Sequence, residues 1–585
     1  MSVFYDEASL VLVPSGYKAS KVYAQKPLTA DGQLTFSRAS TATRVGPDGL
    51  IEKVRTNLFS YSEAFDNAAW LKGSSAGIAL PVVTANNTTA PDGTSTADKV
   101  DLPALTGSEF SIIYREPSVA GSHTTSVYLK GPVGGEVVYL SWTPDGVNYV
   151  RTACTLTTAW QRFTLTATTL TTWGFSIGVD LRDSSQDDQS AQTFFIWGAQ
   201  LETGDIATDY IATTSAAVSV GRLANVPRLD YTNSTCPKLL LEPQRTNVAQ
   251  YSEQFDNAFW NKSGNIAVTA NAAVSPDGYT NADLIYGASS GTISSLQRSI
   301  GAAGVNTYTN SIFVKYSGKQ WFYIFEFSGN SGGNFFDIQN GVLGTQNFGS
   351  GGFITPYGNG WYKVGFTQSL TSGNVWAIYG ISNADNVYTN TASGFDGAYV
   401  WGAQVEAGAY ATSYIPTTTA AVTRLADVGG NKTSASALIG QTEGAMFLEF
   451  VAGEDTSAAS AILYGIFDST SSNNRIQLVS RLGLLTTYIE ANSVGYAVNP
   501  TLATLTNGTT YKAALAYSAA GIVIYVNGVL VYTNTSALAF TATLATISVG
   551  SRATIDSYGK GERISQTLLF KTRLTNAQLA ELTSL

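Results

Sequence analysis

The chain has 585 residues, enough for about three to five domains, and its charged share of 13% is low. The net charge is −9 and no basic block occurs, which argues against binding to a phosphate backbone. Aromatic residues (11%) occur along the whole chain, which excludes disorder, and no apolar run approaches the ~20 residues of a membrane helix.

The start of the chain, MSVFYDEASLVLVPSGYK, has no basic segment leading into an apolar one, so we expect no secretory signal. Cys154 and Cys236 are too few for a disulfide framework. Residues 34–54, LTFSRASTATRVGPDGLIEKV, have the alternation of strands. We expect residues 1–56 to form a strand-rich attachment segment that leads into the next domain.

A long phrase then occurs twice. RTNLFSYSEAFDNAAW (55–70) matches RTNVAQYSEQFDNAFW (245–260), and three further segments match in the same order. These are 90–100 with 275–285, 126–130 with 311–315, and 197–218 with 401–422. The matches predict a tandem duplication of a domain, with copies at 57–218 and 246–424. Residues 219–245 contain the apolar run KLLLE and are expected to form a connecting strand segment.

Both copies have the pattern of antiparallel strands. Short runs such as SVYLK and WFYIFEF lie between clusters of Gly, Asn, Asp and Ser, and the turn tripeptide PDG occurs four times in the chain. Many short strands with closely spaced turn signals are typical of sandwiches and jelly rolls. We therefore predict an all-β fold of multi-domain antiparallel β-sandwiches, with a jelly roll in each copy.

Residues 425–585 form a further domain outside the repeat. GIVIYVNGVLVYTN (521–534) places Asn527-Gly528 between two alternating runs, which predicts a two-residue hairpin. Near the end, Thr575 and Gln578 have the spacing of a capping box and predict a short helix.

Several of these phrases also carry a family resemblance. The two copies resemble carbohydrate-binding-module-like jelly rolls, through the segments Asn57–Trp70 and Asn247–Trp260 and the Gln-aliphatic-Glu-x-Gly turns at 200–204 and 404–408. The last domain is similar to laminin-G/concanavalin-like sandwiches. Together with the preface FSRASTATRVGPDGLIE (36–52), the set resembles structural proteins of tailed bacteriophages. The resemblance implies a virion surface component with glycan contact.

Catalytic motifs are scarce in the sequence. His123 is the one histidine, so a Ser-His-Asp triad would have to use it, and its Gly/Ser surroundings favour a loop position instead. Glycoside hydrolysis needs two suitably spaced carboxylates, and we find no such pair. We expect no enzyme activity and no cofactor. A phage depolymerase or glycan hydrolase stays open as the enzyme hypothesis.

Four acidic positions occur in both copies, and they allow a structural Ca²⁺ as an alternative to turn capping. These are Glu63/Glu253, Asp66/Asp256, Asp98/Asp283 and Glu202/Glu406. No set of ligands stands out, and no metal site is predicted.

The tryptophans separate into shared and unshared positions. Four pairs occur in both copies and are predicted to be core, because both copies fill the same kind of interior: Trp70/Trp260, Trp160/Trp361, Trp173/Trp376 and Trp197/Trp401. When the two copies are aligned without gaps from Ser126 and Ser311, Trp321 corresponds to Glu136, a residue type that is rarely buried. Trp321 is therefore the predicted ligand or subunit contact. Tyr323 lies on the same strand face, although its counterpart Val138 leaves core burial open.

The sequence thus predicts a non-enzymatic virion surface protein, made in the cytoplasm of a host bacterium. Head decoration, head fibre, tail fibre and tail adaptor all stay open as its position. The expected partners are other virion proteins, further copies of the chain (a trimer by analogy with fibres) and host-surface glycans, with no nucleic acid and no membrane span. Two rival hypotheses are a bacterial surface adhesin and an architectural spacer without a ligand.

Overall fold

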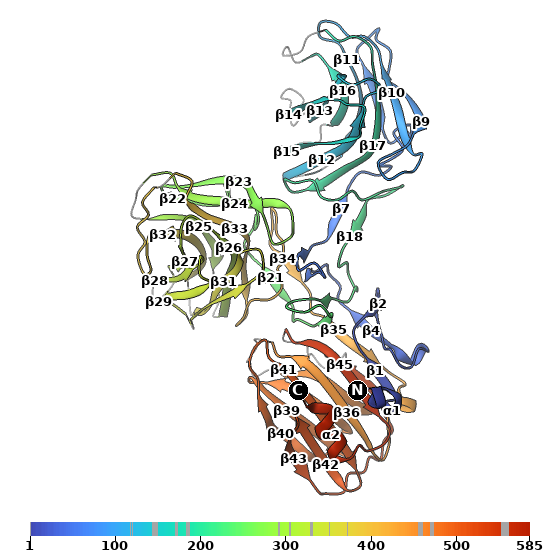
Figure 1. Ribbon diagram of the computed structural model, residues 1–585, viewed down its shortest axis with the longest axis vertical. Coiled ribbons are helices and arrows are strands. Elements are labelled where there is room, and N and C mark those ends of the chain that lie inside the picture. Colours follow the sequence, from blue (N-terminus) through green and yellow to red (C-terminus); the bar gives the residue numbers. More distant parts are fainter. Residues whose placement is uncertain are drawn as a thin grey trace. The chain divides into compact units, whose positions relative to one another are not determined.

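A computed structural model describes the chain apart from residues 1, 118, 120, 143–149, 170–173, 183–187, 290–292, 303–305, 328–331, 350, 371–372, 393, 454–459, 469–472, 551–560 and 585. The chain forms two compact units. One contains Met1–Lys53, Arg222–Gly278 and Ala282–Leu585, and the other contains Val54–Gly221 with Tyr279–Asn281. Both are built from antiparallel sheets, so the protein consists of all-β sandwich domains (Figure 1).

The sandwich that includes the C-terminal residues, named here the terminal sandwich, also takes strands from two earlier parts of the chain. Its first sheet has the order β19 (Leu229–Asp230), β20 (Lys238–Leu240), β45 (Arg563–Phe570), β36 (Gly444–Val451), β41 (Thr510–Ser518), β42 (Gly521–Val526), β43 (Val529–Asn534), with β1 (Leu10–Leu12) beside β45. Its second sheet has the order β2 (Gly16–Lys18), β3 (Lys21–Tyr23), β4 (Gln33–Ser37), β35 (Val428–Lys432), β44 (Leu544–Val549), β37 (Ala461–Asp468), β38 (Arg475–Arg481), β39 (Leu484–Ala491), β40 (Val494–Thr504).

This arrangement differs from the expectation for residues 1–56. The strands at 10–37 do not form a separate attachment segment, because β1 pairs with β45 and β4 pairs with β35, more than half the chain away. Within residues 219–245, β19 and β20 pair with each other and β20 pairs with β45. Alternation in a sequence predicts a strand but not its partner, so only the strand character of both segments was predictable.

Short elements complete the terminal sandwich. The predicted hairpin joins β42 to β43, with positive φ at both Asn527 (48°) and Gly528 (81°). The predicted capping box is present, since the Thr575 side chain accepts from the Gln578 amide at the start of α2 (Asn576–Thr583). The remaining elements are α1 (Ser2–Glu7), the 3₁₀ turns Ala30–Gly32 and Ser436–Leu438, and the hairpin of β5 (Arg44–Val45) with β6 (Ile51–Glu52).

A buried ion network lies where the separate chain segments of this unit meet. Asp427 accepts from Arg38 at 2.9 Å and also pairs with Arg228, and all three side chains are fully buried. Arg228 continues to Glu242 at 2.7 Å, and Glu242 also pairs with Arg424 at 2.9 Å. The network therefore joins residues of the N-terminal segment, the connecting segment and the C-terminal side of the second copy.

Similar arginine–glutamate pairs flank both copies in sequence. Arg424, which follows the second copy, pairs with Glu242, which precedes it. Arg222, which follows the first copy, pairs with Glu52, which precedes that copy, at 3.3 Å. Each copy also has a two-stranded ribbon formed by its first and last strands: β7 (Arg55–Asn57) pairs with β18 (Val218–Val220), and β21 (Arg245–Asn247) with β34 (Val422–Arg424).

Both copies are jelly rolls with the same strand order. In the first, the sheets are β15-β12-β17-β10-β9 and β14-β13-β16-β11-β8. In the second they are β30-β31-β26-β33-β24-β23 and β29-β28-β27-β32-β25-β22, which is the same order with one added edge strand in each sheet. The structural match supports the duplication inferred from the sequence.

The strand bounds in the first jelly roll are β8 (Leu71–Ser74), β9 (Val82–Thr88), β10 (Ala97–Leu102), β11 (Phe110–Arg115), β12 (Gly121–Lys130), β13 (Val137–Trp142), β14 (Val150–Thr155), β15 (Gln161–Thr169), β16 (Phe175–Asp180) and β17 (Gln192–Thr203). In the second they are β22 (Asn261–Gly264), β23 (Ile266–Val274), β24 (Thr280–Gly287), β25 (Ser294–Ala302), β26 (Asn306–Ser317), β27 (Trp321–Glu326), β28 (Gly332–Asp337), β29 (Val342–Gln346), β30 (Gly352–Pro356), β31 (Trp361–Leu370), β32 (Asn374–Ser382) and β33 (Gly397–Ala407).

The repeated phrase YSExFDNAxW closes one end of each sandwich. Its tyrosine has a positive φ (55° at Tyr61, 48° at Tyr251), and its carbonyl accepts from the indole of the tryptophan nine residues on. That tryptophan, Trp70 or Trp260, is 1% exposed and packs in the core between the sheets. The phrase is therefore a structural closure in both copies.

The other shared tryptophans lie elsewhere. Trp197 and Trp401 are buried in small clusters away from the two sandwich cores, where half-buried Trp160 and buried Trp361 accompany them. Trp173 lies outside the described residues. Trp376 is half-buried and faces away from the core, which differs from the prediction that it is core.

A one-residue slip explains the difference at Trp376. Gly178 of β16 lies opposite Tyr139, and Gly380 of β32 lies opposite Tyr323, so these two glycines are equivalent in the copies. Counting back four residues from each glycine shows that Trp376 is equivalent to Gly174 of the first copy, not to Trp173. Because side chains alternate between sheet faces, a shift of one residue moves a side chain to the other face.

We predict that Trp70→Ala and Trp260→Ala each lower the free energy of unfolding of their own jelly roll by ~3–5 kcal/mol, the usual cost of emptying a large aromatic site. Calorimetric unfolding of the full chain measures this. Trp321→Ala, at a half-buried site, is the matched control and should cost less than ~1 kcal/mol. Small effects at both core positions would contradict the closure role.

Candidate functional site

The outer face of the β27 sheet carries the two residues that the sequence singled out. Along β27, Phe322 and Ile324 face the core, so Trp321, Tyr323 and Phe325 face outward. Tyr323 is nevertheless only 1% exposed, because Tyr388 packs edge-on against its ring at 5.2 Å. Tyr323 is therefore a support for this face and not a solvent-facing contact.

Trp321 is half-buried at one end of the same face, beside Asp337 of β28 and Ser382 of β32. The strand register makes Trp321 equivalent to Val137 of the first copy, because Tyr323 is equivalent to Tyr139. The comparison with Glu136, on which its exposure was predicted, was one residue out of register. Trp321 is half-buried and keeps some exposed area, but equivalence with Glu136 is not the reason for that exposure.

At the other end of this face, Phe325, Phe327 and Trp376 form what we name the aromatic platform. Phe327 is 48% exposed, and its ring lies 5.0 Å from Phe325 and 5.2 Å from Trp376. In β25, Ser299 pairs with Trp376 and supplies a half-buried hydroxyl-bearing residue on the neighbouring strand. Sequence reasoning missed the platform, although the alternation in FYIFEF (322–327) was an available signal.

A buried polar layer underlies the platform. Glu326 is fully buried and accepts from the Gln368 side chain at 2.7 Å and from the backbone amide of Trp376 at 3.2 Å. Asn310 donates to the Trp376 carbonyl at 3.2 Å and accepts from the Tyr379 hydroxyl at 2.7 Å. These hydrogen bonds hold the backbone of β32, and with it Trp376, in one position.

The first jelly roll has an aromatic pair in the equivalent interior. Trp142 occupies the position of Glu326, is 1% exposed, and donates to Thr125 at 3.2 Å. His123 packs against it with ring centroids 4.4 Å apart, and its Nδ1 bonds the Gly121 carbonyl. His123 is fully buried, not in a loop as expected, and burial lowers its pKa. Its ring is a packing group within the sandwich.

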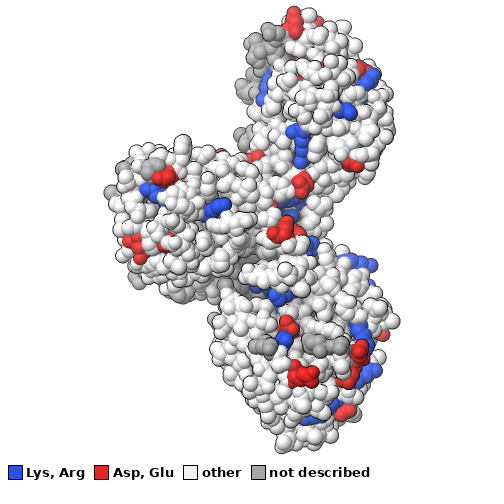
Figure 2. Space-filling view, in the orientation of Figure 1, with Lys and Arg blue, Asp and Glu red and all other residues white. Residues whose placement is uncertain are grey.

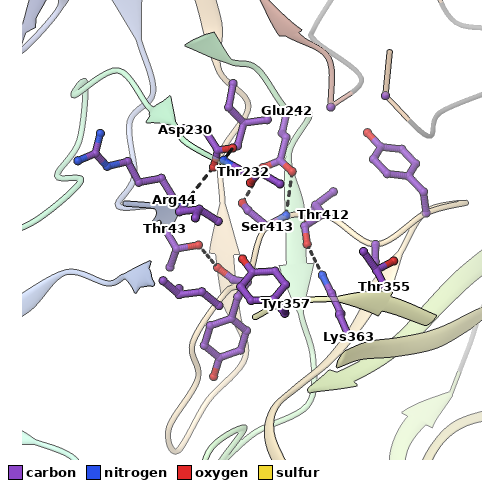
Figure 3. A pocket seen from close by; sticks show the side chains of 18 of the residues that line it. Thr43, Arg44, Asp230, Thr232, Glu242, Thr355, Tyr357, Lys363, Thr412 and Ser413 are labelled. Carbon is purple, nitrogen blue, oxygen red and sulfur yellow. Dashed lines mark hydrogen bonds between the residues drawn. The ribbon is translucent and has the colours of Figure 1, made fainter. Parts of the chain in front are cut away.

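A separate cavity of about 140 Å³ lies in the first of the two units (Figure 3). Its polar side chains bond mainly within its own wall: Ser413 donates to Glu242 at 2.6 Å, and Lys363 donates to the Thr412 carbonyl at 2.8 Å. Burial alone would raise the pKa of Glu242, but Arg424 and Arg228 outweigh it and hold that pKa well below its usual range. Glu242 therefore stays ionised, which does not suit a general acid.

The carboxylates shared by the copies hold backbone and side-chain donors. Asp98 accepts from the amides of Phe65 and Asn86, and Asp283 accepts from the equivalent pair. Glu202 and Glu406 each accept from a glutamine and a threonine of their own turn. Among the described residues, no group of three His, Cys, Asp or Glu side chains is placed to hold a metal ion.

Charged residues make up only 13% of the chain. Figure 2 shows Lys, Arg, Asp and Glu scattered among uncharged residues on the face displayed. None of the described helices is long and apolar enough to cross a membrane. Contacts on such a surface depend mainly on aromatic and neutral polar groups.

No protein-family model matches the chain, and no curated protein matches it. Among solved structures, the chain is similar to the CBM40 of Ruminococcus gnavus IT-sialidase, with 16% identity and a TM-score of 0.24 over 27% of this chain and 94% of that one. It is also similar to the leech intramolecular trans-sialidase, with 14% identity and a TM-score of 0.23 over 27% of this chain and 26% of that one. The receptor-binding domain of botulinum neurotoxin mosaic serotype C/D matches with 12% identity and a TM-score of 0.21, over 26% of this chain and 41% of that one. Scores this low carry no argument about function.

We predict that His123 makes the first jelly roll less stable in mild acid. Its pKa is lowered in the folded state, so its stabilising contribution is present above the unfolded pKa of about 6.5 and is lost as pH falls through that value toward the folded pKa. The midpoint temperature of the wild type should fall more between about pH 7.5 and pH 5 than that of His123→Gln. Equal pH dependence of both proteins would contradict the prediction.

Proposed function

We propose that the protein is a non-enzymatic surface component of a tailed-phage virion that contacts glycans through the aromatic platform of its second jelly roll. The observation that carries the proposal is the exposed ring of Phe327, placed beside half-buried Trp376 and Phe325 on a strand face. The virion setting rests on the resemblance of the phrases at 36–52 and in both copies to phage structural proteins.

An aromatic platform suits the apolar face of a sugar ring. Exposed aromatic area forgoes about 25 cal/mol per Å² while it stays in water, so covering it with the C–H groups of a sugar is favourable. Neighbouring polar groups then fix the orientation of the ligand, and Ser299 and Gln297 lie on the adjacent strand, opposite Trp376 and Ile378. The firm backbone under Trp376 lowers the entropy lost on binding.

The proposal is for binding without hydrolysis. Hydrolysis of a glycosidic bond requires two carboxyl groups at a defined separation beside the bound sugar. Glu326, the acid beneath the platform, is fully buried and accepts from Gln368 and from the Trp376 amide, which supports a positioning role. Assembly of the chain into a homo-oligomer, with a trimer as the working case, would multiply a weak site by avidity.

We predict that Trp376→Ala and Phe327→Ala each weaken binding to a captured glycan at least ~10-fold, about 1.4 kcal/mol. A glycan array screened with the full chain identifies the ligand, and titration of each variant gives its affinity. Phe395→Ala is the matched control, because Phe395 is also exposed (68%) in this jelly roll but contacts Tyr286. It should bind like the wild type.

Two results would count against the proposal. Binding that is unchanged in both platform variants would place the glycan elsewhere, and no binding to any glycan would favour an architectural spacer. Immunogold labelling of intact phage particles tests the virion setting separately. Label on the particle surface is the expected result.

A further inference from the structure

The outer face of the β26 sheet in the second jelly roll is occupied by a lysine from a preceding segment of the chain. The Nζ of Lys53 lies 2.6 Å from Glu253 and 2.7 Å from Asp277, and 5.2 Å from the centre of the Trp401 ring. Burial alone would lower the pKa of Lys53, but Asp277 and Glu253 outweigh it and keep the ammonium form. The site therefore binds an ammonium group between two carboxylates and over an indole.

The residues just before Lys53 complete this contact. The Ile51 amide donates to the Pro276 carbonyl at 2.9 Å, and the Ile51 side chain is buried with Phe313, Trp361, Trp401 and Tyr414. With the segment in place, these four aromatic residues are at most 3% exposed. Lys53 thus fills the acidic half of the site, and Ile51, two positions before it, fills the aromatic half.

The first jelly roll has the same site. Glu63 and Asp92 occupy the positions of Glu253 and Asp277, and Trp197 and Tyr210 occupy those of Trp401 and Tyr414. The Tyr210 hydroxyl donates to Glu63 at 3.0 Å, as that of Tyr414 does to Glu253 at 2.9 Å. The ring centroids of the Trp–Tyr pair are 4.6 Å apart in both copies.

In the first jelly roll, this site is open. No cation pairs with Glu63 or Asp92 among the described residues. The nearby Lys130 lies over the rings of Trp160 and Phe195 and donates to Thr88. Asp92 is exposed, whereas its counterpart Asp277 is 3% exposed. The rings of Tyr128, Trp160 and Tyr210 are half-buried, whereas their counterparts are buried.

The two acids of the open site have no cationic partner among the described residues and are held by neutral donors only. The Tyr210 hydroxyl donates to Glu63 at 3.0 Å, and burial together with the charge of Glu63 raises the pKa of Tyr210. Asp92 accepts from the backbone amide and the hydroxyl of Thr94, at 2.9 and 2.7 Å. An ammonium group placed between them would form charge-assisted hydrogen bonds to both acids, as Lys53 does to Glu253 and Asp277 in the second copy. The apolar half-site beside them would gain from burial in the same step.

We propose that the first jelly roll docks a segment of another protein in which an aliphatic residue lies two positions before a lysine. The lysine ammonium would lie between Glu63 and Asp92 over Trp197, and the aliphatic side chain would cover Trp160, Tyr210 and Tyr128. A peptide is favoured over a sugar because the occupant of the sister site is a peptide that also uses its backbone amide. A second copy of this chain is disfavoured, because its own segment 50–53 already fills the sister site.

The test uses the full chain and a synthetic blocked peptide with the sequence of residues 47–54, PDGLIEKV. Titration followed by fluorescence anisotropy should give a weak affinity, with a dissociation constant on the order of 0.1–1 mM. The peptide with Gln in place of the lysine should bind at least ~10-fold more weakly. The double variant E63Q/D92N should lose the same factor, and Asp66→Asn, an exposed acid of the same phrase, should lose none.

Zero-length carbodiimide crosslinking keeps the test decisive if E63Q/D92N fails to fold. Crosslinks from the peptide lysine to Glu63 or Asp92 of the wild type, located by mass spectrometry, support the site. No binding up to about 5 mM, equal binding of the lysine and glutamine peptides, or crosslinks only to other acids would overturn it. A glycan that binds the wild type and is lost in E63Q/D92N would also overturn it, because the site would then be a sugar site.

Discussion

The buried network of Arg38, Arg228, Arg424, Asp427 and Glu242 is the constraint on which the larger unit depends. Its members come from segments almost 400 residues apart in the chain, and each charged group is satisfied only when all segments are in place. A buried ion pair contributes little net stability compared with apolar packing, but removing one partner leaves a costly uncompensated charge. The network therefore acts mainly by specifying how the N-terminal strands, the connecting strands and the chain beyond the second jelly roll assemble.

The two jelly rolls show how duplication separates structure from function. The closure phrase, the strand order and the buried carboxylate caps are the same in both copies, because each sandwich needs them to form. The outer faces have diverged. One copy has a covered lysine site and an aromatic platform, and the other has the same lysine site left open, with Trp142 in place of Glu326. The shared features therefore stabilise the fold of each copy, and the diverged outer faces are the surfaces on which the copies differ in binding.

The sequence was informative where a pattern is local. The duplication, the β class, the hairpin at Asn527 and the capping box at Thr575 all follow from repeated phrases and turn chemistry. Predictions that depended on counting across loops failed by one residue, at Trp321 and at Trp376, because a single-residue slip exchanges the two faces of a strand. The partners of the N-terminal strands had no local signal. The matching phrases RLAN (222–225) and RLAD (424–427) were an available signal that both segments share a structural role.

The stability of Asp427→Asn tests the role of the network most directly. Calorimetry of the full chain should show the transition of the larger unit destabilised by ~3–5 kcal/mol, because Arg38 and Arg228 lose their shared carboxylate. The transition of the first jelly roll should not change. Asp31→Asn, which removes an exposed partner of Lys432, is the control and should cost less than ~1 kcal/mol. A loss at Asp427 no larger than that of the control would show that the network does not hold these segments together.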